Sequence, residues 1–127
     1  MHEKLLTKEQ IRRFPFIGET EGHDNPLVIA RWFSCANGWT WLATEACALL
    51  HDGSKVRLAD VTNWYAVADV LFFGVVFGFE TEYGYWSFNE FQAVNRTRAV
   101  GVERDKYFTS VGLKDAMAQE ERQRGTL

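Results

Sequence analysis

The sequence is poor in the residues that build disulfide-stapled or metal-bound domains. Its 127 residues include 2 cysteines and 3 histidines. The histidines, His2, His23 and His51, each precede an acidic residue and lie at the N-terminus or in expected loops. No pair of His or Cys has the spacing of metal ligands, so we expect no bound metal and no cofactor.

The chain also lacks a long apolar run and a strong excess of one charge. Its most apolar stretch, residues 67–79, contains Asp69 and is too short to cross a bilayer. No apolar segment follows the N-terminus, and we expect a cytoplasmic protein without a membrane anchor. The net charge of −3 and the pI near 5.6 argue against direct nucleic-acid binding, which needs clustered Lys and Arg.

Aromatic residues, in contrast, are abundant, with 5 Trp, 4 Tyr and 10 Phe. Such side chains bury a large area and favour strands. A chain of this length fits one domain, so most of them should lie in a single core. An exposed subset near a hairpin end or in residues 80–86 would form a binding surface, because Trp and Tyr dominate interface hot spots.

An Asn-Gly pair, Asn37-Gly38, separates two runs that are rich in strand-forming residues, 27–35 and 39–47. An Asn-Gly pair in this position predicts a hairpin with a two-residue turn. The register of that hairpin would place Ser34 opposite Trp41. Several Trp side chains would then share one face of the sheet.

The same register keeps the two cysteines apart. Cys35 would lie opposite Thr40, and Cys47 follows Thr40 by seven residues, a span of about 23 Å at the rise of a strand. A disulfide requires Cα atoms within about 7 Å. We therefore expect both thiols to be reduced and unbridged.

Residues 70–79 are apolar at successive positions. This pattern indicates a strand that is covered on both faces, and hence an interior strand of an antiparallel sheet. Gly74 and Gly78 would leave gaps that a backbone or a ring could approach. If Phe73 is fully buried, its truncation to alanine should cost roughly 3–5 kcal/mol. Residues 80–84 are expected to form a turn.

Helices are expected at three places. The segment Thr7-Lys8-Glu9-Gln10 is a capping box that predicts a short helix ending before Pro15. A second capping box, Ser87-Phe88-Asn89-Glu90, predicts a helix to about residue 94. Residues 110–124 suit a third helix with one apolar side.

The remaining segments complete the fold expected from the sequence. Residues 100–108 should hold a short edge strand. Residues 48–69 give no clear assignment apart from a turn at 51–54. The sequence therefore predicts a single α+β domain, with a central antiparallel sheet, a tight Asn-Gly hairpin and a few short helices.

Acidic residues occur in two close pairs, Glu80 with Glu82 and Glu103 with Asp105. Acid–base catalysis needs two carboxyl groups across a cleft. A solvated turn explains the first pair, and the alternating charges around the second suit an edge strand or an ion-pair network. An enzyme stays an alternative, in which Glu45 joins Glu82 and the second pair in one cleft.

Four motifs give the chain a family resemblance. They are LLTKEQ at 5–10, GWTWLATE at 38–45, LFFGVVFGFETEYGYWS at 71–87 and GVERDKYF at 101–108. In order and spacing they resemble the domain of unknown function 2958 family, from the N-terminus to Phe108. The family usually passes quickly from the second motif to the third, whereas this chain inserts residues 48–68. The helical tail at 110–127 also looks individual.

The resemblance implies a biological setting rather than a chemistry. The family is known mainly from plasmids, integrative elements and phages, often among genes that counter host defences. No catalytic activity or cofactor is established for it. The motif positions of this chain, none with a known role, are Trp39, Trp41, Glu45, Phe73, Gly74, Glu82, Gly84, Tyr85, Glu103, Arg104 and Asp105.

We therefore expect a non-enzymatic accessory protein of a mobile element that binds a host protein complex. A defence nuclease or a CRISPR effector is the candidate target, and steric inhibition the candidate mode. The alternatives are a structural or regulatory module without an anti-defence role, and the carboxylate enzyme. We expect the insertion to form or flank the binding surface, because recognition is usually placed on loops over a rigid scaffold. The residues expected to bind are Trp39, Trp41, Trp64, Tyr65, Glu80, Glu82, Tyr83 and Tyr85.

Overall fold

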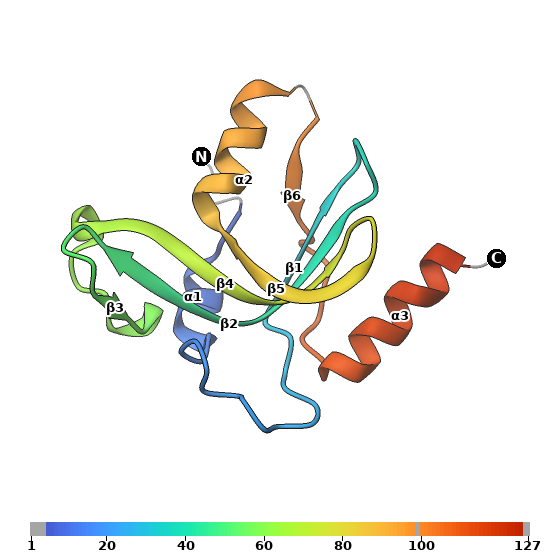
Figure 1. Ribbon diagram of the computed structural model, residues 1–127, viewed down its shortest axis with the longest axis horizontal. Coiled ribbons are helices and arrows are strands. Elements are labelled where there is room, and N and C mark those ends of the chain that lie inside the picture. The colour runs from blue at the N-terminus through green and yellow to red at the C-terminus, as the bar shows by residue number, and fades with distance from the viewer. Residues whose placement is uncertain (1–4, 99, 126–127) are drawn as a thin grey trace.

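The structure is a computed structural model that describes residues 5–98 and 100–125. In this part of the chain, a six-stranded antiparallel sheet carries helices on both faces (Figure 1). The strands are β1 (Ala30–Ser34), β2 (Thr40–Leu50), β3 (Lys55–Val56), β4 (Val67–Phe77), β5 (Thr81–Ser87) and β6 (Val102–Arg104). The α-helices are α1 (Lys8–Arg13), α2 (Phe88–Thr97) and α3 (Leu113–Gly125), and the 3-10 helices are η1 (Leu58–Asp60) and η2 (Trp64–Ala66).

The strands lie in the order β5-β4-β2-β1-β6, and β3 pairs with β2 off this path. β4 lies between β5 and β2, which confirms the interior strand predicted for residues 70–79. β6 ends the sheet and confirms the edge strand predicted within residues 100–108. The predicted α+β fold class is thus confirmed. No helix in the described residues is long and apolar enough to cross a membrane.

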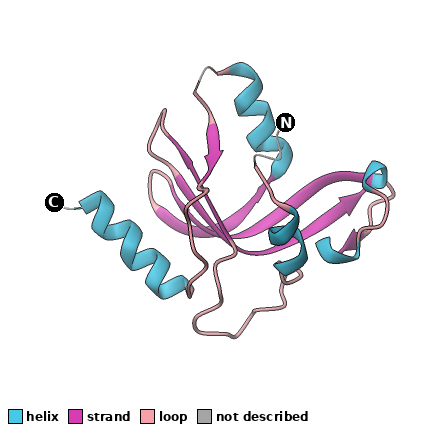
Figure 2. Cartoon of the chain, turned by 180° about the vertical axis from the view of Figure 1, so that it is seen from behind, coloured by secondary structure: helices cyan, strands magenta, loops and turns pink. Residues whose placement is uncertain are grey.

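Two clusters of buried side chains cover the two faces of the sheet. On one face, α1 and α2 pack over a cluster that contains the fully buried Trp32 and Phe72. On the other face, α3 packs over Leu42, Val75 and Phe77. Figures 1 and 2 show α2 and α3 on opposite sides of the sheet, so we name these surfaces the α2 face and the α3 face.

The hairpin between β1 and β2 differs from the predicted one. The last hydrogen bond of the ladder joins the N–H of Ser34 to the carbonyl oxygen of Trp39. The four residues 35–38 therefore form the loop. Trp32 lies opposite Trp41, so the predicted register is displaced by two residues. A two-residue Asn-Gly turn needs positive φ at both positions, whereas here Gly38 has a φ of +77° and Asn37 does not have a positive φ. The prediction of a tight, two-residue Asn-Gly turn is therefore wrong. Because the displacement is an even number of residues, the tryptophans still share a face.

Gly74 of β4 and Gly78, in the bend that follows β4, confirm the gaps expected from the sequence. A Cβ atom added to Gly74 would lie 1.9 Å from the carbonyl oxygen of Leu42, where β2 carries a bulge. A Cβ atom added to Gly78 would lie 2.9 Å from the ring of Trp39. The first glycine thus admits a neighbouring backbone, and the second admits an aromatic ring.

The turn predicted for residues 80–84 is wrong. β5 begins at Thr81, and the bend occupies residues 78–80. Gly84, which suggested a turn, lies within the strand opposite Gly74. Phe73 is half-buried rather than fully buried, so the condition attached to its large predicted cost is not met.

The starts predicted for the first two helices agree with the structure. Thr7 caps α1 and Ser87 caps α2, and both capping boxes are complete. α1 ends before Pro15 as expected, and α2 continues to Thr97, beyond the predicted end. The third helix begins at Leu113 rather than near residue 110.

Residues 48–68, the expected insertion, include the ends of two long strands. β2 continues to Leu50, which pairs with Val67 at the start of β4. The predicted turn at 51–54 is confirmed, and β3, η1 and η2 follow it. Leu58 of η1 is only 1% exposed and belongs to the α2-face core. The segment therefore covers part of the sheet as well as adding surface.

Candidate functional site

A hollow of about 370 Å³ opens on the α2 face between the β1–β2 loop, β4, β5 and α2. We call it the hairpin hollow. Its wall combines aromatic and aliphatic side chains with a few polar groups. The lining residues are Ser34, Asn37, Trp39, Trp41, Val76, Tyr85, Trp86, Glu90, Phe91, Val94, Arg98 and Val102. The structure thus brings together Trp39, Trp41 and Tyr85 from the expected binding set.

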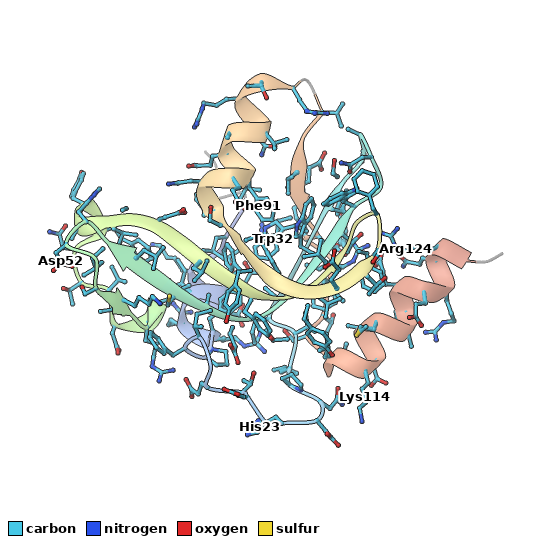
Figure 3. All side chains as sticks on the ribbon, viewed as in Figure 1. His23, Trp32, Asp52, Phe91, Lys114 and Arg124 are labelled. Carbon is cyan, nitrogen blue, oxygen red and sulfur yellow. The ribbon has the colours of Figure 1, made fainter. Side chains whose placement is uncertain are left out.

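A chain of aromatic rings leads from solvent into the hollow. Phe79, in the bend between β4 and β5, is 95% exposed and packs edge-on against Trp39, with 5.3 Å between ring centroids. Trp39 lies 6.1 Å from Trp41, and Trp41 lies 5.0 Å from Phe91 of α2. Phe91 in turn contacts Trp32 in the core at 5.3 Å, and Figure 3 shows these two side chains close together. An exposed ring therefore contacts a series of rings that runs from the half-buried Trp39 and Trp41 to the buried Phe91 and Trp32.

Acidic side chains border this chain of rings. Glu80 follows Phe79 directly and is exposed, and so is Glu82. Glu82 lies opposite Val76, which lies opposite Trp41, so Glu82 lies on the α2 face at the outer strand of the sheet. We define Trp39, Trp41, Phe79, Glu80 and Glu82 as the hairpin-end surface.

Tyr83 and Tyr85 form a second exposed aromatic group. They are 64% and 61% exposed, and they lie opposite Val75 and Phe73 in the ladder. Their ring centroids lie 6.3 Å and 4.9 Å from that of Phe73. Although Tyr85 borders the hairpin hollow, its ring packs on Phe73, on the face opposite to Glu82. β5 therefore presents aromatic rings on one face and acid on the other.

Trp64 and Tyr65, expected to bind from the insertion, lie in η2 and not in the hairpin hollow. Tyr65 is 95% exposed and Trp64 is 44% exposed. Trp64 lines a separate cavity of about 320 Å³ together with Val67 and Phe88. The structure thus leaves both aromatic side chains exposed outside the hairpin hollow.

Glu45 is buried and has a structural role. It is 3% exposed, and its carboxylate accepts hydrogen bonds from the backbone N–H of Gly18 at 2.7 Å and of Thr20 at 2.9 Å. The hydroxyl of Thr20 donates a third hydrogen bond. Gly18 has a φ of +89°, which suits glycine in this turn. Glu45 thus holds the loop before β1 against the sheet.

The acidic and basic residues near β6 also hold elements together. Arg31 forms ion pairs with Asp105 at 3.0 Å and with Glu120 of α3 at 2.8 Å. Glu120 is 5% exposed and also accepts hydrogen bonds from Thr40 and Arg124. This network, beside the Arg124 labelled in Figure 3, ties α3 to the sheet. It confirms the ion-pair interpretation for Asp105.

The four carboxylates of the enzyme hypothesis do not meet. Glu82 lies on β5 and Glu103 on β6, at opposite edges of the sheet. Four inter-strand steps separate these strands, which is about 19 Å. The carboxylate of Glu45 accepts hydrogen bonds from the loop before β1, and that of Asp105 forms an ion pair with Arg31. This separation removes the shared cleft that a carboxylate enzyme would need. Arg104, the remaining motif residue, lies opposite Trp32 at the edge of the sheet.

The histidines and cysteines form no chemical cluster in the described residues. No group of three or more His, Cys, Asp or Glu there could hold a metal ion, and His2 lies outside the described residues. Cys35 is exposed in the β1–β2 loop, Cys47 is buried in β2, and both are free. Burial raises the pKa of the Cys47 thiol above its usual range.

The two thiols should therefore differ in reactivity. We expect DTNB to modify one thiol rapidly in the native protein and the second only after unfolding, because a buried thiol with a raised pKa forms little thiolate. The release of the coloured product, followed in buffer and in denaturant, measures both. Cys35→Ser should remove the rapid phase. Two rapid phases in the native protein would contradict the burial of Cys47.

Sequence reasoning missed two central residues of this site. Phe79 was counted within an apolar strand, yet it lies in the exposed bend after β4. Phe91 was not singled out, although it lies one turn into the helix that begins after the second capping box, where an apolar side chain often faces the core. Trp86 also lines the hollow, and its indole N–H is buried without an acceptor among the described residues.

Comparisons with known proteins give a family and nothing more specific. A family model described as "Protein of unknown function (DUF2958)" matches residues 3–127. This match agrees with the resemblance carried by the four motifs. No curated protein and no solved structure matches the chain.

Proposed function

The chain belongs to the DUF2958 family of proteins of unknown function, and from this premise we propose that it acts by binding another protein through its hairpin-end surface. The single observation that carries the proposal is Phe79, which is 95% exposed and lies edge-on against the ring of Trp39. A large aromatic side chain that is exposed beside other aromatic rings offers a partner a large apolar area to bury. Such residues dominate the energy of protein interfaces.

The charges around Phe79 suggest how a partner is oriented. Glu80 and Glu82 are exposed beside it, and the segment 77–87 contains no Lys or Arg. Acidic groups at an interface rim favour a basic partner surface and speed its approach. We propose that they engage Lys or Arg side chains that otherwise contact nucleic acid. Under this proposal the protein acts in the cytoplasm as an accessory factor of a mobile element, and it blocks a host defence nuclease or CRISPR effector.

Phe79→Ser should weaken partner binding without unfolding the protein. If Phe79 is a hot spot, its loss costs about 2 kcal/mol, or roughly 30-fold in Kd. The melting temperature should hardly change, because the side chain is already exposed. Binding to the purified partner by calorimetry, together with thermal melting, measures both. Tyr107→Ser is the matched control, since Tyr107 is 89% exposed and follows β6 at the other edge of the sheet.

Site-specific photo-crosslinking can identify the partner first. p-Benzoylphenylalanine is placed at position 79, 65 or 107 in separate proteins produced in host cells, and crosslinked proteins are identified by mass spectrometry. We expect a discrete host protein from position 79 and none from position 107. Capture from position 65 as well would extend the surface to the insertion. Capture from position 107 but not from position 79 would refute the hairpin-end surface.

The hypothesis that residues 48–68 contribute to binding is best tested by a point substitution rather than by deletion. Replacing residues 50–67 would remove the buried Leu58 and the Leu50–Val67 pair, so the fold itself would be at risk. Substitution of the exposed Tyr65 by serine leaves these contacts in place. Loss of binding with an unchanged melting temperature would assign η2 a direct role, and unchanged binding would remove it from the interface.

A further inference from the structure

β5 is an open edge strand without the features that usually protect one. All seven of its residues pair with β4 in an unbroken register, and it ends the sheet on its side. Its other side therefore presents unpaired backbone N–H and C=O groups among the described residues. Natural edges are usually blunted by lysine, proline, a bulge or short length. The sequence of β5, TEYGYWS, has no Lys or Pro and only one charged residue, Glu82.

The residue types of β5 are nearly symmetric about its centre, Gly84. Moving outward, Tyr83 mirrors Tyr85, and Thr81 mirrors Ser87. If a second β5 lay antiparallel to the first with Gly84 opposite Gly84, each tyrosine would face a tyrosine of the other copy. Aromatic pairs and hydroxyl pairs are both favourable across strands. The strand is thus complementary to itself.

The single charge of β5 is compatible with this register. Glu82 would face Trp86 of the second copy, and the two Glu82 side chains would lie about 14 Å apart along the strands. A register displaced by four residues toward the N-terminus, and so centred on Glu82, would instead place Glu82 opposite Glu82. Like charges directly opposite each other destabilise a sheet. Electrostatics therefore favours the register centred on Gly84.

We propose that the protein forms a two-fold dimer in which the β5 strands of two copies pair antiparallel about Gly84. The two sheets become one continuous sheet, with both α3 helices on the same face. Tyr83 and Tyr85, now 64% and 61% exposed, are covered by their counterparts. This isologous pairing is the commonest form of homodimer symmetry. It goes beyond the proposed function, because it adds a second copy of this chain as a partner. Of the hairpin-end surface, only Glu82 lies within the paired strands.

The oligomeric state of the full chain tests the pairing. Sedimentation velocity over a wide concentration range should show a reversible dimer. The double variant Tyr83→Lys with Tyr85→Lys places ammonium groups opposite each other twice and should be monomeric. The double variant Tyr83→Lys with Tyr85→Glu places an ammonium opposite a carboxylate twice and should restore the dimer. No other register gives this pattern of loss and rescue.

Several results would overturn the proposal. They are a wild-type protein that is monomeric at every concentration, a Lys/Lys variant that dimerises as the wild type does, or a Lys/Glu variant that does not recover. Circular dichroism checks that both variants fold. If either does not, hydrogen exchange of the wild type decides: amides of residues 81–87 should exchange more slowly as concentration rises, and exchange independent of concentration refutes the pairing.

Discussion

Gly74→Ala should destabilise the protein by about 3 kcal/mol or more, although it adds only one methyl group. The new Cβ atom would lie 1.9 Å from the carbonyl oxygen of Leu42 and 3.0 Å from the Cα atom of Ala43. Both obstructing atoms belong to the backbone of β2, so no side-chain rotation can relieve the contact. The strands would have to separate at the bulge, within the long β2–β4 ladder. Urea denaturation followed by tryptophan fluorescence measures the loss.

Gly84→Ala is the matched control for this prediction. Gly84 lies directly opposite Gly74 in the next strand, and a Cβ atom there would meet no atom within 4 Å. Because alanine also restricts the unfolded chain, we expect no loss, or a gain of less than about 1 kcal/mol. Both variants are compared at the same low protein concentration. Equal losses at the two positions would show that glycine flexibility, and not backbone approach, is what Gly74 provides.

Phe72→Ala should be the costliest truncation of an aromatic residue in β4, at roughly 3–5 kcal/mol. Phe72 is fully buried. Its ring lies 4.8 Å from that of Trp32 and 5.9 Å from that of Trp86, measured between centroids. Its removal leaves a cavity among rigid rings that cannot collapse to fill it. For a domain of this size the melting temperature should fall by roughly 10–20 °C.

Phe73→Ala provides the comparison. Phe73 is half-buried, and its neighbours Tyr83 and Tyr85 are themselves exposed, so water can fill the space that it leaves. We expect a loss of about 1–2 kcal/mol, in proportion to the smaller apolar area returned to water. Calorimetric unfolding of both variants compares the two positions. A loss at Phe73 equal to that at Phe72 would mean that the α3 face is more tightly covered than the structure shows.

The elements that the sequence predicted well are those specified by local chemistry. The capping boxes at Thr7 and Ser87 need only residues three positions apart, and both are present. The apolar run at 70–79 likewise predicts a strand, and its glycines predict close neighbours, from the local sequence alone. A glycine in a strand admits a close neighbour whatever that neighbour is. The identity of the neighbour, the Leu42 carbonyl or the Trp39 ring, depends on pairing with β2 and could not be predicted.

The errors arose where a local signal competes with tertiary pairing. Asn37-Gly38 suits a two-residue turn, but the ladder of β1 with β2 stops at Ser34 and leaves a longer loop. Gly84 suggested a turn, yet it lies within a strand opposite another glycine. Alternation alone did not reveal on which face of β4 the phenylalanine would be fully buried. Phe72 and Phe73 are adjacent and chemically identical, and only the placement of α1 and α2 decides which is buried.

The candidate site was predicted in part for the same reason. Trp39 and Trp41 are close in sequence, and their meeting at one hollow follows from strand alternation. Phe91 reaches them from α2, and its approach depends on how that helix crosses the sheet. The acids that the alternative enzyme hypothesis would bring together are separated because β5 and β6 lie at opposite edges. No pattern within the chain specified that strand order.

The pairing of β6 with β1 has a consequence for how the chain folds. Trp32 lies opposite Arg104, so the sheet's far edge joins segments from the first and last thirds of the sequence. Contacts over such separations form slowly, because the closure of a long loop must precede them. During synthesis the open side of β1 stays unpaired until residues 102–104 have left the ribosome. We therefore expect the nascent chain to form first the β1–β2 and β4–β5 hairpins, whose pairings are local in sequence, and β6 to join the sheet last.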